Sequence, residues 1–141
     1  MTDNNETNDA TRIVVSIGSN LPDALQRVAK AIEWLSEKFS DFKASALYTT
    51  SPISGKGPDY ANAVAMGTTS LAPEVVTEAF KDYERSEGRD EAARLSGMVP
   101  IDLDLVYYGY SCLRTGDASR EYFLKGARAL GLLPTITSSS K

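Results

Sequence analysis

One short segment constrains this chain more than any other: residues 101–107 read Ile-Asp-Leu-Asp-Leu-Val-Tyr. Apolar and acidic side chains alternate there, and successive side chains of a β-strand point to opposite faces of a sheet. The segment therefore predicts a strand that carries Asp102 and Asp104 on one face. The apolar residues between them point the other way, into a core.

The two aspartates have two interpretations. Like charges side by side on a strand repel each other, which is a cost without a structural gain. A hard divalent cation removes that cost, and Mg²⁺ in proteins takes one or two carboxylates together with substrate phosphates. The pair then marks a metal–phosphate site on the open face of a sheet. The alternative is a solvated strand face on which acids keep the sheet soluble, and the Asp-x-Asp spacing alone favours that alternative.

Composition narrows the class of protein. The chain has 141 residues, of which 42% are hydrophobic and 24% charged, as expected for one globular domain with a hydrophobic core. The net charge of −4 argues against a nucleic-acid-binding protein, which needs a basic surface. A bound polyphosphate would therefore be held by local positive charge or by a metal ion.

Histidine is absent, and Cys112 is the only cysteine. The sequence thereby excludes a histidine general base, a Ser-His-Asp triad, a histidine-bound zinc site and an internal disulfide. One cysteine fits a reducing cytosol and no apolar run is long enough to span a membrane, so we expect a cytoplasmic protein. Residues 1–11 are polar and lack the features of a signal peptide, so we expect a disordered arm there, and a flexible tail at 135–141.

Hydrophobic periodicity divides residues 12–134, which we expect to form a single domain, into seven elements. Strands are predicted where β-branched or alternating residues gather, and helices where apolar residues recur every three or four positions. Ser19 or Asn20 is expected to cap the first helix, and Pro73 to open the second. The predicted strands are 12–17, 42–49, 60–68 and 101–108, and the predicted helices are 22–39, 73–87 and 119–132, with loops at 51–59 and 89–98.

The order β-α-β-β-α-β-α predicts a ferredoxin-like split βαβ sandwich of the α+β class, an antiparallel sheet with helices on one face. The strands at 12–17 and 101–108 are then central neighbours, and the other face of the sheet is expected to be free to bind a ligand. RNA-binding modules share this topology, but they stack bases on aromatics of the central strands. Residues 14–16 and 102–104 are instead apolar and acidic, which argues against that function.

Five segments make the chain recognisable when they are taken in order. Each alone carries little information, since Gly-Ser-Asn-Leu by itself is only a capped turn. The segments are VSIGSNL at 15–21, SALYTTSP at 45–52, PDYANAV at 58–64, YERSEGR at 83–89 and IDLDL at 101–105. In this order and spacing they resemble the 6-hydroxymethyl-7,8-dihydropterin pyrophosphokinase family (2-amino-4-hydroxy-6-hydroxymethyldihydropteridine diphosphokinase), over residues 12–130.

The resemblance implies an enzyme of folate biosynthesis that transfers the terminal pyrophosphoryl group of ATP to the pterin hydroxymethyl group and releases AMP. It implies two Mg²⁺ ions on Asp102 and Asp104, with Arg89 as a further catalytic residue. Phosphoryl transfer needs mainly positioning and neutralisation of charge, which such residues provide. The resemblance places pterin-binding residues at Thr50, Ser51, Ile53, Tyr60, Asn62 and Tyr122, and nucleotide-binding residues at Glu84, Arg89, Arg94, Leu105 and Arg120.

The residues expected on the pterin side differ in how well their chemistry supports that role. Asn62 carries an amide that both donates and accepts, as a flat polar heterocycle requires. Tyr60 and Tyr122 are compatible with stacking on pterin, but also with ordinary packing in the core.

The phosphate side departs from the family pattern. The resemblance implies an arginine three residues before Asp102 and a histidine before the last helix, but Val99 occupies the first position and the chain has no histidine. Valine makes no bidentate contact with phosphate, and one lost contact of this kind costs about 10²–10³-fold in rate. The substitutes that the sequence offers are Arg89, Arg94, Lys56, Arg114 and Arg120.

Three functions therefore stay open: a pyrophosphokinase with substitute cations, a catalytically inactive relative that binds pterin or metal, and an interaction module that uses the open sheet. The retained aspartate pair favours the first, since an inactive protein has no need of two repelling carboxylates. The lost arginine and histidine favour the second. The expected partners are pterin and ATP, with no nucleic acid and no membrane, and the expected assembly is a monomer or weak dimer.

Overall fold

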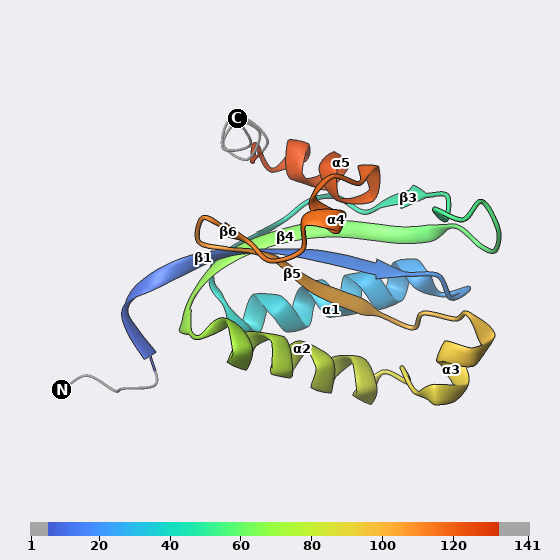
Figure 1. Cartoon of the computed structure of the whole chain (residues 1–141), viewed down its shortest axis with the longest axis horizontal. Helices are drawn as coiled ribbons and strands as arrows, with labels where there is room; N and C mark the ends of the chain where they lie inside the picture. Colours follow the sequence, from blue (N-terminus) through green and yellow to red (C-terminus); the bar gives the residue numbers. More distant parts are fainter. Residues whose placement is uncertain (1–5, 133–141) are drawn as a thin grey trace.

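The computed structural model describes residues 6–132. Figure 1 shows one antiparallel sheet with α1 and α2 below it and α4 and α5 above it. The tail expected at 135–141 and the first five residues of the expected arm lie outside the described residues. The elements are β1 (Glu6–Ser19), α1 (Ala24–Lys38), β2 (Ser40–Ala44), β3 (Tyr48–Thr50), β4 (Tyr60–Leu71), α2 (Pro73–Ser86), α3 (Glu91–Ser96), β5 (Asp102–Tyr108), β6 (Ser111–Cys112), α4 (Thr115–Ala118) and α5 (Glu121–Ala129).

The topology of the sheet confirms the predicted α+β fold. The strand order is β2-β4-β1-β5-β6, and β3 also pairs with β4. β1 runs antiparallel to both β4 and β5, so the first strand and the aspartate strand are neighbours, as predicted. β2 and β3 together take the place of one predicted strand, which gives the split βαβ arrangement.

The predicted strand at 42–49 is broken by Ser45. The Ser45 amide donates to the Val64 carbonyl at 2.8 Å, and the Val64 amide donates to the Ser45 hydroxyl at 3.0 Å. A side-chain oxygen here takes the place of a backbone carbonyl in the hydrogen-bond ladder with β4, so β2 ends before Ser45. The chain pairs with β4 again in the short strand β3. There Tyr48 pairs with Asn62.

Two further segments differ from expectation. β1 begins at Glu6, inside the arm expected to be disordered, because Glu6 pairs with Leu71 beyond an irregularity in the β1–β4 ladder. The predicted loop at 89–98 contains α3, since the carboxylate of Asp90 caps a helical turn by accepting from the Ala93 amide at 2.9 Å.

The main hydrophobic core lies between the sheet and the pair α1 and α2. It takes alternate residues of the central strands, since only one face of each strand turns toward these helices. Pro73 opens α2 as predicted. The largest fully buried members are Phe80, Ile13, Ile17, Leu35, Ile101, Val15, Val28 and Val76.

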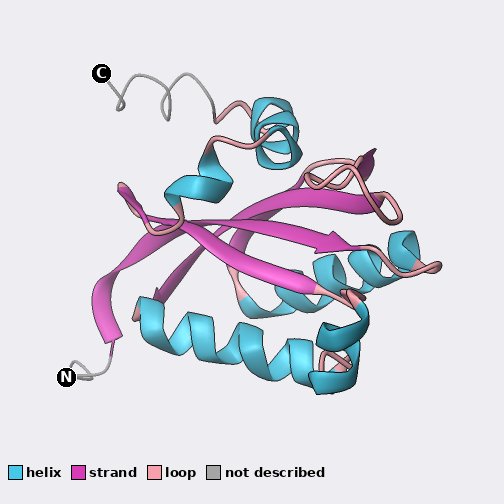
Figure 2. Cartoon of the chain, turned by 45° about the vertical axis from the view of Figure 1, so that its right-hand side comes forward, coloured by secondary structure: helices cyan, strands magenta, loops and turns pink. Residues whose placement is uncertain are grey.

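A second, smaller core lies on the opposite face, so the face expected to be free is partly covered. Figure 2 shows α5 above the sheet, and Phe123 and Ala127 of this helix pack against Val64. The contact is close because α5 carries Gly126, where an added Cβ would lie 2.5 Å from Val64. The sequence predicted a helix over these residues but not the face that it covers. The uncovered remainder of this face contains the candidate site.

Candidate active site

The register of the sheet aligns a row of residues across three strands. Gly18 in β1 pairs with Asn62 in β4 and with Asp102 in β5. Directly opposed residues point to the same face, so Asn62 and Asp102 flank a residue that has no side chain. A Cβ at Gly18 would lie 3.4 Å from the Asn62 Oδ1 atom. The glycine therefore forms an open floor between an amide and a carboxylate.

The next row carries the second aspartate. Ser16 pairs with Val64 on one side and with Asp104 on the other. Since Val64 lies under α5, Asp104 lies close to the boundary between the covered and the open part of this face. Its side chain is 15% exposed, whereas that of Asp102 is 34% exposed. The predicted alternation along the strand is confirmed, because both rows belong to one face.

A cavity of about 600 Å³ is lined by Asn62 and Asp102, the two residues that flank Gly18, and we call it the pterin cavity because the residues expected to bind pterin line it. Asn62 is buried at its base, and its Nδ2 donates to the Thr50 hydroxyl at 2.8 Å and to the Tyr60 carbonyl at 3.3 Å. These two bonds fix the orientation of the amide. All six residues expected on the pterin side line the cavity together with Asp102: Thr50, Ser51, Ile53, Tyr60, Asn62 and Tyr122.

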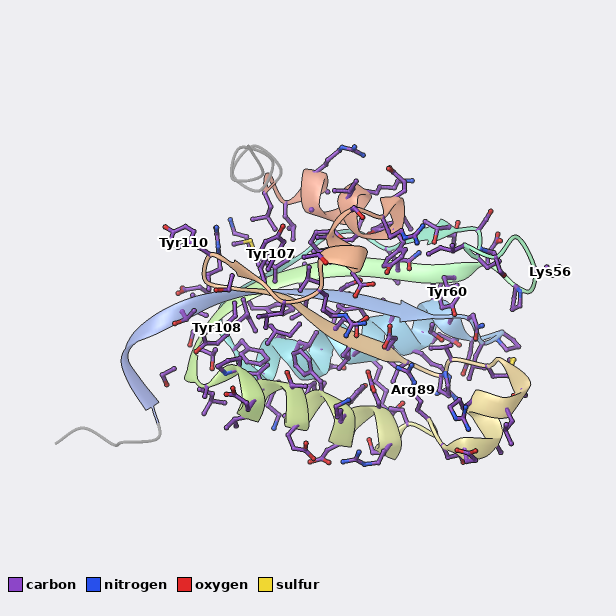
Figure 3. All side chains as sticks on the ribbon, viewed as in Figure 1. Lys56, Tyr60, Arg89, Tyr107, Tyr108 and Tyr110 are labelled. Carbon is purple, nitrogen blue, oxygen red and sulfur yellow. The ribbon has the colours of Figure 1, made fainter. Side chains whose placement is uncertain are left out.

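The two tyrosines of the cavity have different surroundings. Burial raises the pKa of Tyr60, and the charge of Asp102 raises it further. Tyr122 lines the cavity and also packs against the second core, so both of its predicted environments occur together. Figure 3 shows Tyr60 near Arg89 at one end of the sheet, with Lys56 at the tip of the loop beyond them.

Gly97 and Met98 of the loop at 97–99 also line the cavity, and the Gly-Ser-Asn motif holds this loop in place. The Asn20 side chain accepts from the Val99 amide at 2.7 Å and donates to the Gly97 carbonyl at 3.1 Å. The Ser19 hydroxyl donates to the Val99 carbonyl at 3.1 Å. The expected helix cap is therefore wrong: no side-chain cap forms at α1, because these polar groups bind a loop distant in sequence.

Each aspartate of the pair faces an arginine. Arg89 Nη1 lies 2.6 Å from Asp102 Oδ1, and Arg114 Nε lies 3.5 Å from Asp104 Oδ1. Burial raises the pKa of Asp104 to about 8, the nearby Asp102 adds to this rise, and Arg114 opposes it. Burial and the charge of Asp102 therefore favour the protonated form of Asp104 at neutral pH when no cation is bound.

Arg89 is held between α2 and β5 by more than one acid. Glu84 Oε2 lies 3.3 Å from Arg89 Nη1 and also accepts from the Leu103 amide at 2.8 Å. Burial raises the pKa of Glu84. Burial alone would lower the pKa of Arg89, but the hydrogen bond and charge of Asp102, together with Glu84, raise it. The guanidinium is therefore charged and already oriented toward the aspartate pair.

Two further cavities adjoin Arg89 on the phosphate side. One, of about 510 Å³, contains the expected nucleotide residue Arg94 together with Val99. The other, of about 420 Å³, follows the open edge of β5 and contains Leu105 with both aspartates and Arg114. Glu84, Arg89 and Lys81 line both cavities. These cavities bring together four of the five residues expected to bind the nucleotide.

The fifth, Arg120, lies elsewhere. It lines a cavity of about 720 Å³ between α5 and the segment at 49–53, with Lys125 and Arg128. Among the other substitutes, Lys56 lines the pterin cavity, and Arg94 forms an exposed pair with Glu91 at 2.5 Å. Only Arg89 and Arg114 lie within 4 Å of the aspartate pair in the described part of the chain.

The chemistry of the aspartate pair suits Mg²⁺. Both donors are hard oxygen ligands on one strand face, and the raised pKa of Asp104 reflects its burial and the charge of Asp102, both of which a bound cation would offset. Within residues 6–132 no group of three or more acidic or sulfur side chains gathers as a metal site. A cation at Asp102 and Asp104 would therefore take further ligands from water or from a bound phosphate.

Comparison with known proteins decides the family. The model of the 7,8-dihydro-6-hydroxymethylpterin-pyrophosphokinase family matches residues 14–132. The chain belongs to this family. A pyrophosphokinase from Pseudomonas putida is 32% identical over 69% of this chain and 82% of its own length. One from Haemophilus influenzae is 30% identical over 89% of this chain and 80% of its own length.

Other relatives in the pyrophosphokinase family are much longer. The chain is 30% identical to the folate synthesis bifunctional protein of Arabidopsis thaliana over 74% of its residues, but the match spans only 22% of that relative. Within the described residues of this pyrophosphokinase-family chain, no helix combines the length and the apolar character needed to cross a membrane.

Sequence reasoning missed three contributors to this pyrophosphokinase-family site. Lys81 gave no signal beyond a helix-surface position, and Asn20 resembled a cap. Asp117 accepts from both Arg114 and the Tyr122 hydroxyl, yet it lies in a short segment without periodicity. Its spacing three residues after Arg114 was the only available sign of an ion pair.

Proposed function

We propose that this chain transfers pyrophosphate from ATP to 6-hydroxymethyl-7,8-dihydropterin, as a step of folate biosynthesis. The observation that carries the proposal is the pterin cavity, in which six expected pterin residues surround Asp102. Arg89 lies on the far side of Asp102 and opens into both phosphate-side cavities. A flat polar ring and a triphosphate would thus bind in separate cavities that adjoin each other at the aspartate pair.

In the reaction the pterin hydroxymethyl oxygen forms a bond to the β-phosphorus of ATP, and the bond from that phosphorus to the bridging oxygen of AMP breaks. The hydroxyl proton passes to water, and AMP departs as the second product with the electron pair of the broken bond. In this chain, Asn62 and Thr50 orient the ring edge, and the glycine floor lets the ring approach the sheet. Positioning of this kind is the main contribution a protein makes to phosphoryl transfer.

Charge neutralisation falls to Arg89 and Arg114, because they lie beside the two aspartates. Asp102 and Asp104 would hold the two Mg²⁺ ions that the family implies, and the bound ions would neutralise phosphate oxygens. Cations on the two carboxylates would weaken the pairs that Arg89 and Arg114 form with them, and each guanidinium would then be available to a phosphate. Arg89 remains anchored through Glu84 and the Ile101 carbonyl, which accepts from Nη1 at 3.2 Å.

AMP release from purified protein tests the proposal, with 6-hydroxymethyl-7,8-dihydropterin, ATP and Mg²⁺ as substrates. We expect AMP formation that depends on pterin and disappears in Asp102→Ala prepared in the same way. AMP formation that continues without pterin, or at equal rate in the variant, would contradict the assignment.

The residues of the phosphate side also favour a second function. Both arginines next to the pair are neutralised by acids, and Val99 stands where the resemblance implies an arginine. An inactive relative that binds pterin or metal would show this pattern. Calorimetric pterin binding without any AMP formation, in protein shown to be folded, would support this second function over the first.

The proposed partners and cellular location follow from the sequence. We propose pterin and ATP as the small-molecule partners of a monomer or weak dimer in the cytoplasm, and the lone Cys112 fits a reducing compartment. Bifunctional folate synthesis proteins of Arabidopsis thaliana and of Pisum sativum carry the word mitochondrial in their names. Fractionation of the native cells would test this location.

A further inference from the structure

We propose that Asp117 is a positioning residue that couples the pterin cavity to the phosphate side, because its carboxylate joins Tyr122 to Arg114. The inference rests on the proposed function and adds to it a route by which one substrate strengthens the binding of the other. It also gives a role to a residue that neither the sequence motifs nor the family resemblance singled out.

The Asp117 carboxylate has one partner on each oxygen. The Tyr122 hydroxyl donates to Oδ1, and Arg114 Nε donates to Oδ2. The Asp117 side chain is only 13% exposed, so it is screened from water although Arg114 is half exposed. A buried carboxylate with two charge-assisted bonds is held in one orientation, and so are the groups that donate to it.

The two partners of Asp117 belong to different cavities. Tyr122 lines the pterin cavity, where Asp102 is also part of the wall. Arg114 lines the cavity along the open edge of β5, and its Nε also lies 3.5 Å from Asp104. The chain of contacts from Tyr122 through Asp117 to Arg114 therefore connects the place for the ring to the place for the phosphates.

The main chain of Tyr122 is fixed as well. Its carbonyl accepts from the Tyr48 hydroxyl, and the same hydroxyl accepts from the Gly126 amide at 3.2 Å. Burial raises the pKa of Tyr48 to about 12, so this hydroxyl stays protonated and able to donate. With the backbone held in this way, a movement of the Tyr122 ring is transmitted to its hydroxyl and hence to Asp117.

A pterin against Tyr122 then favours the arrangement in which Asp117 holds Arg114 at the phosphate side, and a nucleotide at Arg114 favours the arrangement of the ring. Coupling between two ligands is reciprocal, so either order of addition must give the same factor. We expect pterin to strengthen the binding of a non-hydrolysable ATP analogue with Mg²⁺ by at least about fivefold, and the reverse.

Isothermal titration calorimetry on the full chain measures this factor, with each ligand titrated in the absence and in the presence of the other. We expect it to fall below about twofold in Asp117→Asn and in Tyr122→Phe, since each removes one bond of the chain. Tyr122→Phe keeps the aromatic ring, which separates the relay from stacking. Asp117→Glu retains a carboxylate and should keep part of the coupling.

Asp82→Asn is the matched control. Asp82 also pairs with an arginine three residues away, Arg85, but its side chain is 65% exposed and it lines none of the cavities described above. A merely structural role of Asp117 would lower the melting temperature of Asp117→Asn and leave the coupling factor unchanged. The control should retain the full wild-type factor.

Three outcomes are decisive. A wild-type factor near one, or an unchanged factor in Tyr122→Phe, overturns the relay and leaves the proposed function intact if AMP is still formed. A wild-type protein that binds neither ligand and forms no AMP overturns both. If Asp117→Asn fails to fold, Tyr122→Phe decides, because it removes a single hydroxyl from a half-buried side chain.

Discussion

The pterin cavity and the phosphate side satisfy their polar groups in different ways. In the pterin cavity a neutral amide, Asn62, is oriented by a hydroxyl and a carbonyl while the space before it stays hollow. On the phosphate side each aspartate of the pair already lies beside an arginine, Asp102 beside Arg89 and Asp104 beside Arg114. The neutral half is preformed, whereas the charged half must exchange internal ion pairs for ligand contacts.

From this difference we expect the two halves to tolerate sequence change unequally. A pocket that reads a flat ring by fixed hydrogen bonds loses its specificity when one group moves, because an unpaired buried polar group is costly. Ion pairs at a half-exposed edge are exchanged at small net cost when new pairs form. The phosphate side can therefore draw its cations from the loop after α2 and from the segment before α4, rather than from position 99.

The largest effect is expected from substitutions in the aspartate pair, because Asp102 lines both the pterin cavity and a cavity of the phosphate side. Asp102→Ala or Asp104→Ala should lower pterin-dependent AMP formation by at least about 10³-fold, because the charge that organises the phosphates is lost. The fold should persist, since both side chains lie on an open face. Circular dichroism checks the fold, and Asp82→Ala on the exposed surface of α2 should keep full activity. Unchanged turnover in either variant would rule out the metal assignment.

Asn62→Ala should separate the two halves. We expect pterin affinity to fall about 10–100-fold, because the variant removes a buried amide and leaves the Thr50 hydroxyl without its donor. Affinity for the ATP analogue should change less than twofold. Calorimetry with each ligand alone measures both. A larger loss for the nucleotide than for pterin would mean that the pterin cavity has been assigned to the wrong ligand.

The folding stability of the metal-free protein should show the energetic cost of burying Asp104 beside Asp102 on the phosphate side. The folded chain keeps a proton on Asp104 up to a pKa of about 8, whereas the unfolded chain releases it near 3.8. Between these values the unfolded state binds fewer protons, so this residue lowers stability as pH rises from about 4 to about 8.

Asp104→Asn removes that dependence while keeping the shape of the side chain. At pH 8 without Mg²⁺ the variant should be more stable than the wild type by about 1–3 kcal/mol, and at pH 4 the two should be equal. Urea unfolding at both pH values measures the difference. A variant that is less stable than the wild type at pH 8 would show that Arg114 outweighs burial at this carboxylate.

Much of the fold was predictable, because it rests on local patterns. The alternation at 101–108 and the apolar periodicity of α1 and α2 correctly indicated the antiparallel sheet and its main core. The second core was not predictable in the same way. Its decisive feature is Gly126, whose role appears only when α5 lies on Val64.

The candidate site likewise has one part that local sequence patterns predicted and one part that they did not. Five of the six residues expected to bind pterin come from the contiguous segment at 50–62 around β3 and β4, where the family motifs lie, whereas Tyr122 comes from α5. The structure brings all six to one cavity. The phosphate side is assembled from long-range contacts, such as Asn20 on the loop at 97–99 and Arg114 on Asp104. No local pattern encodes such contacts, which is why Asn20 was mistaken for a cap and Asp117 was overlooked.

The smallest effect is expected from a substitution that restores the missing arginine at position 99 and therefore tests the phosphate side alone. Val99→Arg should lower the KM for ATP by about 3–10-fold, since the backbone at this position is held by Asn20 and the side chain lines the cavity of Arg89 and Arg94. The KM for pterin should stay the same, because Val99 does not line the pterin cavity. Val99→Leu is the control for side-chain size and should leave both constants unchanged. If the arginine raised the KM for ATP, the charged half would already be balanced by its edge cations, and position 99 would be closed to phosphate.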